Sequence, residues 1–212
     1  MKYLFNNFDV VAELFFQHLQ LTLVVIFFSL LIGIPLGLLL ARVRWLRGPV
    51  MSVLGIIYTI PSLSLFVLLI PIFGLGTKPA IIALIAYAQL LLIRNWLVGL
   101  TTIEPAILEA ARAMGLNGWQ RFWQVEFPLA LPMLLAGIRL VALSSIGIGT
   151  MAAFINAGGL GVLLFQGVTT ANYGKIFAGA LAVTVLSFAT SFFIRYLERR
   201  AEYRIYGRKT SN

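Results

Sequence analysis

The 212-residue chain is 60% hydrophobic and only 11% charged, which is more apolar surface than a soluble domain can bury. Its formal net charge of +9 would suggest nucleic acid in a soluble protein, but Lys and Arg gather here at the ends of long apolar runs. Cysteine is absent and histidine occurs once, which excludes disulfides, thiolate metal sites and a histidine metal cluster. We therefore expect a membrane protein with lipid contacts, no nucleic-acid partner and no metal of its own.

The apolar runs reach about 20 residues, the length that a helix needs to cross roughly 30 Å of hydrocarbon. They are continuous rather than alternating, which favours helices over a β-barrel. We predict an all-α membrane protein with an N-terminal external segment (1–18), a transmembrane domain (19–196) and a cytoplasmic basic tail (197–212) on the inner leaflet. The five transmembrane helices are predicted at residues 19–41, 50–72, 80–100, 129–154 and 176–196.

The orientation follows from the basic residues, because cytoplasmic segments of membrane proteins are enriched in Lys and Arg. With the N-terminus outside, the outer segments hold only Lys2, Lys78 and Lys175. The inner segments then hold most of the arginines, namely Arg42, Arg44, Arg47, Arg112, Arg121 and the C-terminal group that runs from Arg195 to Lys209. We predict that the N-terminus is outside, that the C-terminus is cytoplasmic, and that the long loop at 101–127 faces the cytoplasm.

That loop has the local signals of two short helices joined by a turn. Pro105 suits the first turn of a helix, and Gly115 offers a left-handed stop for it. Asn117 and Gly118 form a turn before a second helix that starts at Trp119. An ordinary amphipathic loop is the alternative, but small Ala110 and Ala111 beside the Glu109 carboxylate favour a docking site for a partner protein.

Polar residues inside the predicted spans are the only available lining for a path through the bilayer. Each of them can instead bond back to its own helix or hold neighbouring helices together. Pro61 is expected to break the second helix within the membrane and to free backbone carbonyls there, a feature that transport paths use. The candidate path residues are Tyr58, Ser62, Ser64, Tyr87, Gln89, Ser144, Ser145 and Thr150.

The connection between the last two spans is rich in glycine. Gly158, Gly159 and Gly161 form either a flexible re-entrant turn or an outer gate that docks a substrate-delivering protein. Arg139, inside the fourth span, is expected to reach the cytoplasmic side or to pair with a carboxylate such as Glu126; a role in the substrate path is the alternative. His18 is expected to be an interfacial residue without chemistry.

No enzymatic site is indicated by the sequence. It contains no nucleophile–base set, no paired carboxylates in a span, and no phosphate-binding glycine loop followed by Lys and Ser or Thr. We therefore predict that the chain has no catalytic residues and cannot hydrolyse ATP itself.

The loop also resembles a known signature. Permease subunits of bacterial ATP-binding-cassette (ABC) importers carry E-A-A, three residues, G, nine residues, and I-x-L-P. Here the matching residues are Glu109, Ala110, Ala111, Gly115 and Pro128, with Val125 and Phe127 in place of Ile and Leu. The resemblance implies a type I importer permease fold (MetI-like), and it implies that these residues couple the permease to its ATPase.

Three further stretches resemble the osmoprotectant branch of that family, the permeases for glycine betaine, carnitine and choline. They are Thr59–Leu65, Gly74–Ala80 and Asn156–Gly161. Methionine permeases share the last stretch, so a permease for methionine or another amino acid is the alternative, and a membrane scaffold without transport is the alternative of another class. The resemblance implies a second permease subunit, identical or related, two ATPase subunits that hold ATP and Mg, and a soluble binding protein outside a bacterial cytoplasmic (inner) membrane.

Overall fold

The computed structural model describes residues 2–206, and every regular element in that range is a helix. Four stretches are long and apolar enough to cross a membrane, and the pair α3–α4 makes a fifth span if it is counted as one. The all-helical prediction is thus confirmed, and the predicted number of five spans holds when the bent pair is counted as one. The elements are α1 (Lys2–Asn6), α2 (Phe8–Arg42), α3 (Arg44–Thr59), α4 (Ser62–Phe73), α5 (Thr77–Thr101), α6 (Pro105–Ala113), α7 (Gly118–Arg121), the π-helical turn η1 (Phe122–Glu126), α8 (Phe127–Gly149), the 3₁₀ turn η2 (Thr150–Ile155), α9 (Gly161–Thr169) and α10 (Tyr173–Tyr206).

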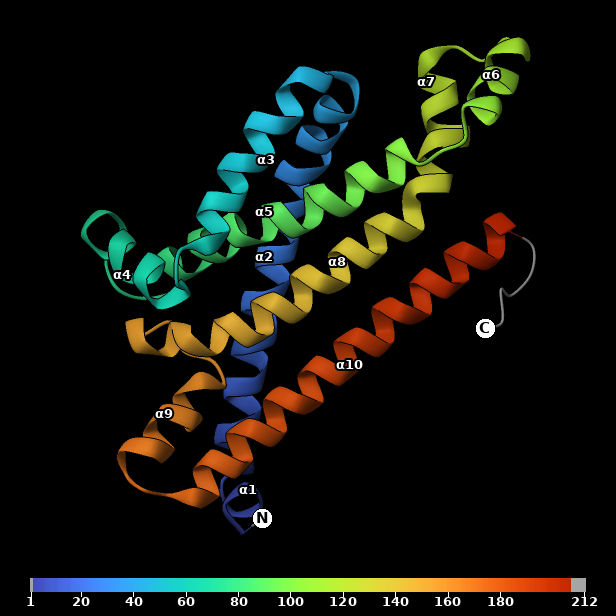
Figure 1. Ribbon diagram of the computed structural model, residues 1–212. Helices are drawn as coiled ribbons and strands as arrows, with labels where there is room; N and C mark the ends of the chain where they lie inside the picture. The colour runs from blue at the N-terminus through green and yellow to red at the C-terminus, as the bar shows by residue number, and fades with distance from the viewer. Residues whose placement is uncertain (1, 207–212) are drawn as a thin grey trace.

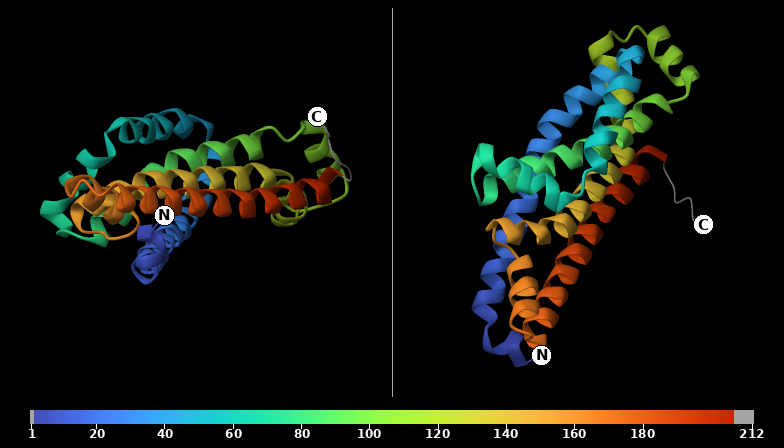
Figure 2. Two further views of the ribbon diagram at one scale, coloured as in Figure 1. Left: turned by 90° about the horizontal axis from the view of Figure 1, so that it is seen from below. Right: turned by 60° about the vertical axis from the view of Figure 1, so that its left-hand side comes forward.

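Helices α5, α8 and α10 lie side by side, with α8 in the middle, and α2 crosses them (Figures 1 and 2). The hairpin of α6 and α7 projects beyond the end of this layer, at the end where α2 turns into α3 and where α10 finishes (Figure 1). The N-terminus, α9 and the start of α10 lie at the opposite end. The arginine-rich segments therefore share one end of the molecule, as the predicted orientation requires.

The contact between α2 and α5 depends on small residues spaced by four. Ser29, Gly33 and Gly37 are all buried on α2. A Cβ atom added at Gly33 would lie 2.6 Å from Leu92 Cδ2, and one at Gly37 would overlap the ring of Trp96. Trp96 Nε1 in turn donates a hydrogen bond to the carbonyl of Ile34 at 3.3 Å. The small residues thus bring two backbones close together, as in other membrane helix pairs.

We expect Gly37→Leu to force α2 away from α5, because Trp96 is fully buried and has no room to move aside. Overpacking of this kind typically costs about 1–3 kcal/mol, and occasionally more, in a dense core. The measurement is the yield of monodisperse protein from membranes, with Gly55→Leu as the control, because nothing lies within 4 Å of a Cβ at Gly55. Equal yields for the two variants would show that the small residues of α2 are not needed for its packing against α5.

The predicted second span is broken at Pro61. Ile60 and Pro61 adopt extended conformations, and the axes of α3 and α4 differ by 96°. Proline disfavours helical geometry in the residue before it and cannot donate the hydrogen bond that would continue α3. The predicted break is present, and it turns the chain almost at a right angle.

Both ends of the chain are more helical than we expected. α2 begins at Phe8, eleven residues before the predicted start of the first span, and this places His18 inside a packed helix. α10 continues to Tyr206, so the tail predicted at 197–212 is an extension of the last span as far as the structure describes it. Arg208 and Lys209 lie outside the described residues.

Candidate functional site

The first helix of the 101–127 loop has defined signals at both ends. Pro105 occupies its first turn. At its end Gly115 has a φ of +79°, a left-handed conformation that glycine adopts without strain. The amides of Gly115 and Leu116 donate to the carbonyls of Arg112 and Ala111, at 2.9 and 3.3 Å. This is a Schellman motif, and it is the stop that the sequence predicted.

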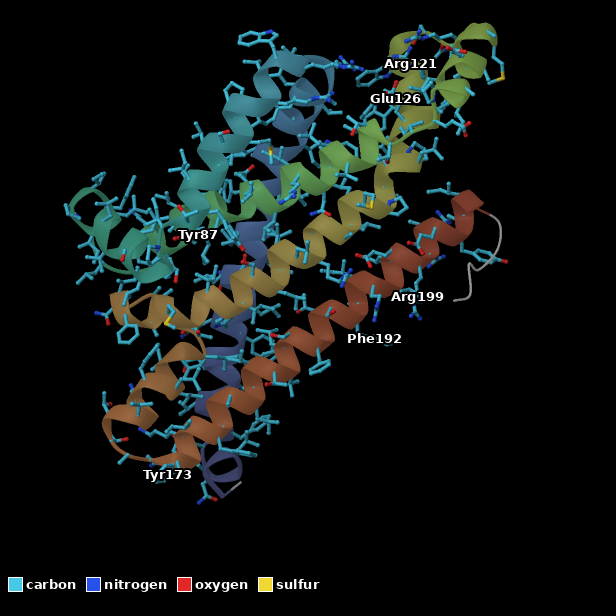
Figure 3. All side chains as sticks on the ribbon, in the orientation of Figure 1. Tyr87, Arg121, Glu126, Tyr173, Phe192 and Arg199 are labelled. Carbon is cyan, nitrogen blue, oxygen red and sulfur yellow. The ribbon has the colours of Figure 1, made fainter. Side chains whose placement is uncertain are left out.

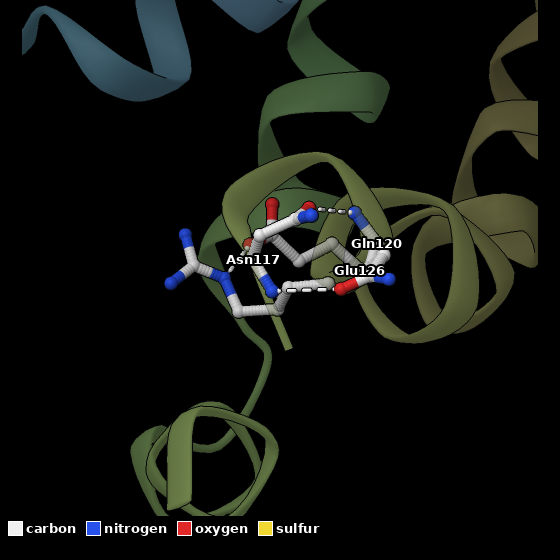
Figure 4. A network of polar contacts seen from close by, with 4 residues as sticks. Asn117, Gln120 and Glu126 are labelled. Carbon is white, nitrogen blue, oxygen red and sulfur yellow. Dashed lines mark hydrogen bonds and ion pairs between the residues drawn. The ribbon is translucent and has the colours of Figure 1, made fainter. Parts of the chain in front are cut away.

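The second helix begins with a capping box. The Asn117 side chain accepts from the amide of Gln120 at 2.9 Å, and the Gln120 side chain accepts from the amide of Asn117 at 3.0 Å (Figure 4). Beyond it, Arg121 and Glu126 form an ion pair at 2.6 Å across the π-helical turn. The loop is therefore an ordered helical hairpin that continues directly into α8.

The signature residues divide into an exposed and a buried set. Glu109, Ala110 and Gly115 are exposed, whereas Ala111 is buried inside the hairpin. Of the two alanines of the motif, only Ala110 is therefore accessible at the surface. Pro128 lies in the first turn of α8, directly after the π-helical turn η1.

The hairpin also exposes large apolar side chains that sequence reasoning missed. Met114 and Trp119 are 72% and 71% exposed, and Ile107 and Trp123 are exposed beside them in sequence. Exposed apolar groups clustered on one element mark an interaction surface. Their position next to the Glu-Ala-Ala motif is the signal that could have identified them.

The candidate path residues do not gather at one place. Tyr58 and Tyr87 meet at the α3–α4 bend with ring centroids 5.8 Å apart, and the Tyr87 hydroxyl donates to the carbonyl of Ile60 at 2.5 Å (Figure 3). Ser62 and Ser64 follow on α4. Part of the backbone freed by the bend is thus satisfied by a tyrosine.

The other candidate path residues take part in separate contacts elsewhere in the bundle. The Gln89 amide donates to the carbonyl of Ser29 on α2 at 3.4 Å, while its oxygen is buried without a partner among the described residues. The Thr150 hydroxyl bonds back to Gly147, as the alternative interpretation allowed. Ser144 and Ser145 lie on α8, half-buried and buried. Two cavities among residues 2–206, of about 600 and 390 Å³, are lined by none of these residues.

The glycine-rich connection is fixed to α2 rather than free. The amide of Gly159 donates to Gln17 Oε1 and the amide of Leu160 to His18 Nδ1, both at 3.2 Å. Gly158 and Gly159 have φ values of +78° and +77°, so the turn depends on glycine. The same segment lines a cavity of about 390 Å³ together with Gln20, Thr77 and Ile81.

The prediction for His18 was wrong. Its side chain is 1% exposed, and its second nitrogen, Nε2, lies 3.1 Å from the carbonyl of Ile146 on α8. Because Nδ1 accepts from an amide, Nε2 carries the proton and donates to that carbonyl. His18 thus links α2 to α8 and to the glycine-rich connection. Both contacts are with residues far away in the sequence, 128 and 142 positions along the chain.

Arg139 pairs with a carboxylate, as predicted, but the carboxylate is not that of Glu126. Its Nε donates to a carboxylate oxygen of Glu198 on α10 at 3.0 Å, while Glu126 pairs with Arg121. The pair is largely buried and links two neighbouring helices, which offsets the cost of placing a cation in a span. Across residues 2–206, no group of three or more His, Asp or Glu side chains could hold a metal ion.

The chain is thus a broken helical bundle with an ordered, partly apolar hairpin at its arginine-rich end, an arrangement compatible with a transport permease. Comparison with known proteins agrees: residues 33–203 match the binding-protein-dependent transport system inner membrane component family, and the chain belongs to it. It is therefore a permease subunit of an ABC importer, a multi-pass protein of the bacterial inner membrane, and ATP is hydrolysed by a separate subunit.

Individual relatives cover nearly the whole chain. The osmoprotectant import permease protein OsmW of Salmonella typhimurium is 38% identical, over 93% of this chain and 94% of that protein. The glycine betaine/carnitine/choline transport system permease protein OpuCB of Bacillus subtilis is 35% identical, over 87% and 85%. A solved methionine ABC transporter, MetNI in an inward-facing conformation, is 27% identical with a TM-score of 0.80, over 88% of this chain and 93% of the matched one.

Proposed function

We propose that this permease imports osmoprotectants such as glycine betaine, carnitine or choline. The observation that carries the proposal is the similarity to permeases named for these substrates, which extends over more than four fifths of the chain. The segments Thr59–Leu65 and Gly74–Ala80, which resemble the osmoprotectant branch, lie at the α3–α4 bend and at the turn into α5.

The chemistry of the candidate path is compatible with such substrates. Its polar side chains are uncharged hydroxyls, phenols and an amide. A zwitterion or a quaternary ammonium has a diffuse charge and needs no strong ion pair at the membrane midplane, where a tight pair would slow release. Selectivity then rests mainly on an aromatic cage in the binding protein, which recognises the cation through its ring faces.

ATP hydrolysis is coupled to transport through the hairpin of α6 and α7. ATPase subunits dock on its exposed surface, where Glu109 and Ala110 are accompanied by Met114 and Trp119. Two ATPase subunits with ATP and Mg, a second permease subunit and a soluble binding protein complete the assembly. Because the hairpin runs directly into α8, a displacement of the docked ATPase moves a membrane span.

A second candidate substrate is methionine, because the solved methionine transporter shares the fold at 27% identity. We expect cells that contain the complete transporter to accumulate radiolabelled glycine betaine, carnitine or choline only when this chain and the binding protein are both present. Competition uptake with unlabelled substrates is the measurement. Accumulation of methionine, but of none of the three osmolytes, would contradict the substrate assignment and leave the permease assignment intact.

The predicted orientation can be tested on one helix. Tyr173 and Tyr203 are exposed near the two ends of α10, and the chain has no native cysteine. We expect Tyr173→Cys, but not Tyr203→Cys, to react with an impermeant thiol reagent on intact cells, and both to react after lysis. The reverse pattern would place the C-terminus outside.

A further inference from the structure

A pocket of about 600 Å³ lies between the membrane spans and the hairpin. Its lining residues come from the end of α2, the start of α3, the end of α5 with the residues that follow it, and the hairpin. Its lining residues are Leu38, Ala41, Arg42, Arg44, Arg47, Leu100, Thr101, Ile103, Pro105, Leu108, Arg112, Arg121 and Glu126. The pocket shares no residue with the candidate substrate path, and Met114, Trp119 and Trp123 do not line it.

Five arginines and one carboxylate line the pocket, and two of these arginines are held by hydrogen bonds or an ion pair within the chain. Arg47 donates to the carbonyls of Leu40 and Ala41, which closes the end of α2. Arg121 is paired with Glu126. The remaining three, Arg42, Arg44 and Arg112, have no ion-pair partner within residues 2–206. They come from two separate parts of the chain, and their shared excess of positive charge attracts an anion.

The other wall of the pocket is apolar. Leu38 and Leu100 belong to the ends of the spans α2 and α5, and Leu108 lies on the inner side of α6. Trp45, next to Arg44, is 76% exposed, and tryptophan is enriched at the head-group level of membrane proteins. The pocket therefore straddles the boundary between hydrocarbon and head groups. A free phosphate would leave this apolar wall unused.

We propose that this pocket binds an anionic phospholipid of the inner leaflet, with the phosphate among Arg42, Arg44 and Arg112 and the glycerol and upper acyl chain against the leucines. Basic pockets between transmembrane helices on the cytoplasmic side bind such head groups. Since Arg112 belongs to α6 and the other two belong to the turn between α2 and α3, the lipid ties the coupling hairpin to the membrane body. The proposal depends on the predicted orientation but not on the transported substrate.

The test uses the complete transporter, solubilised and analysed by native mass spectrometry after equilibration with phosphatidylglycerol. The variant Arg42→Gln/Arg44→Gln/Arg112→Gln should retain this lipid about fivefold less for each arginine, on the order of a hundredfold less for all three. The matched control is Arg199→Gln/Arg200→Gln/Arg204→Gln, which removes three exposed arginines from α10 at the same end of the molecule. It should retain the lipid as the unmodified transporter does.

Three results would overturn the proposal. The first is equal lipid retention by the pocket variant and the unmodified transporter. The second is displacement of phosphatidylglycerol by millimolar inorganic phosphate, which would assign the site to a free anion. The third is that phosphatidylglycerol binds to the permease alone but is lost when the ATPase docks. That result would make the pocket part of the interface between permease and ATPase. The single variant Arg112→Gln, which leaves the α2–α3 turn untouched, keeps the test decisive if the triple variant does not assemble. None of these measurements requires transport, so they are independent of the substrate assignment.

Discussion

Replacing Gly115 with aspartate is expected to leave the permease folded in the membrane and to abolish its coupling to ATP hydrolysis. Gly115 holds the left-handed conformation that ends α6, with a φ of +79°. Most other residues there cost roughly 1–2 kcal/mol of backbone strain, and Asn or Asp costs less. No atom lies within 4 Å of an added Cβ, so the new side chain projects into open space on the surface where we propose that the ATPase docks. Both effects disturb the hairpin surface and not the membrane core.

The measurement is ATP hydrolysis by the assembled transporter in vesicles, stimulated by the loaded binding protein. We expect Gly115→Asp to reduce it at least about tenfold, which corresponds to roughly 1.4 kcal/mol. Gly118→Asp is the matched control, because Gly118 is equally open but has no positive φ, and an acidic residue suits the first turn of α7. Gly115→Asn separates charge from conformation, since asparagine tolerates the left-handed region. Normal stimulated hydrolysis by Gly115→Asp would refute the coupling role.

The coupling hairpin was predictable because its signals are local. Pro105 at a first turn, Gly115 at a helix stop and the turn at Asn117 each act over three to five residues, and the structure has each of them in place. The spans were predictable for a similar reason, since length and hydropathy suffice to identify them. Their boundaries were not, because packing against neighbours extends α2 and α10 beyond the apolar runs.

Features that depend on distant contacts were not predictable. The partner of Arg139 is 59 residues away, on a part of α10 that the sequence suggested was a separate tail. His18 is buried only because the outer connection folds onto α2. α9 escaped notice because nine residues are too short to cross a membrane, so its apolar side chains gave no span signal. The scattering of the candidate path residues over α3, α4, α5, α8 and η2 depends likewise on how distant helices pack.

In the glycine-rich connection, the backbone leaves no room for a side chain at Gly161. Gly161 begins α9, and a Cβ added there would overlap the carbonyl oxygen of Thr150 and lie 2.8 Å from its carbonyl carbon. These are backbone atoms of η2, so no rotamer change relieves the overlap. The same segment carries the hydrogen bonds from Gly159 and Leu160 to α2, so a displaced α9 strains them too.

We expect Gly161→Ala to move α9 away from η2 and to lower thermal stability in detergent by roughly 5–10 °C, because overpacking costs about 1–3 kcal/mol and each kcal/mol shifts the midpoint by a few degrees. We also expect uptake to fall at temperatures where the variant is still folded, since the distorted segment belongs to the face on which we expect the binding protein to dock. Gly147→Ala is the control, as nothing lies within 4 Å of a Cβ there although it precedes the same 3₁₀ turn. Thermal unfolding of both variants, followed by uptake at a temperature where both are folded, separates the two effects. A Gly161→Ala protein as stable and active as Gly147→Ala would show that the close contact between α9 and η2 is dispensable.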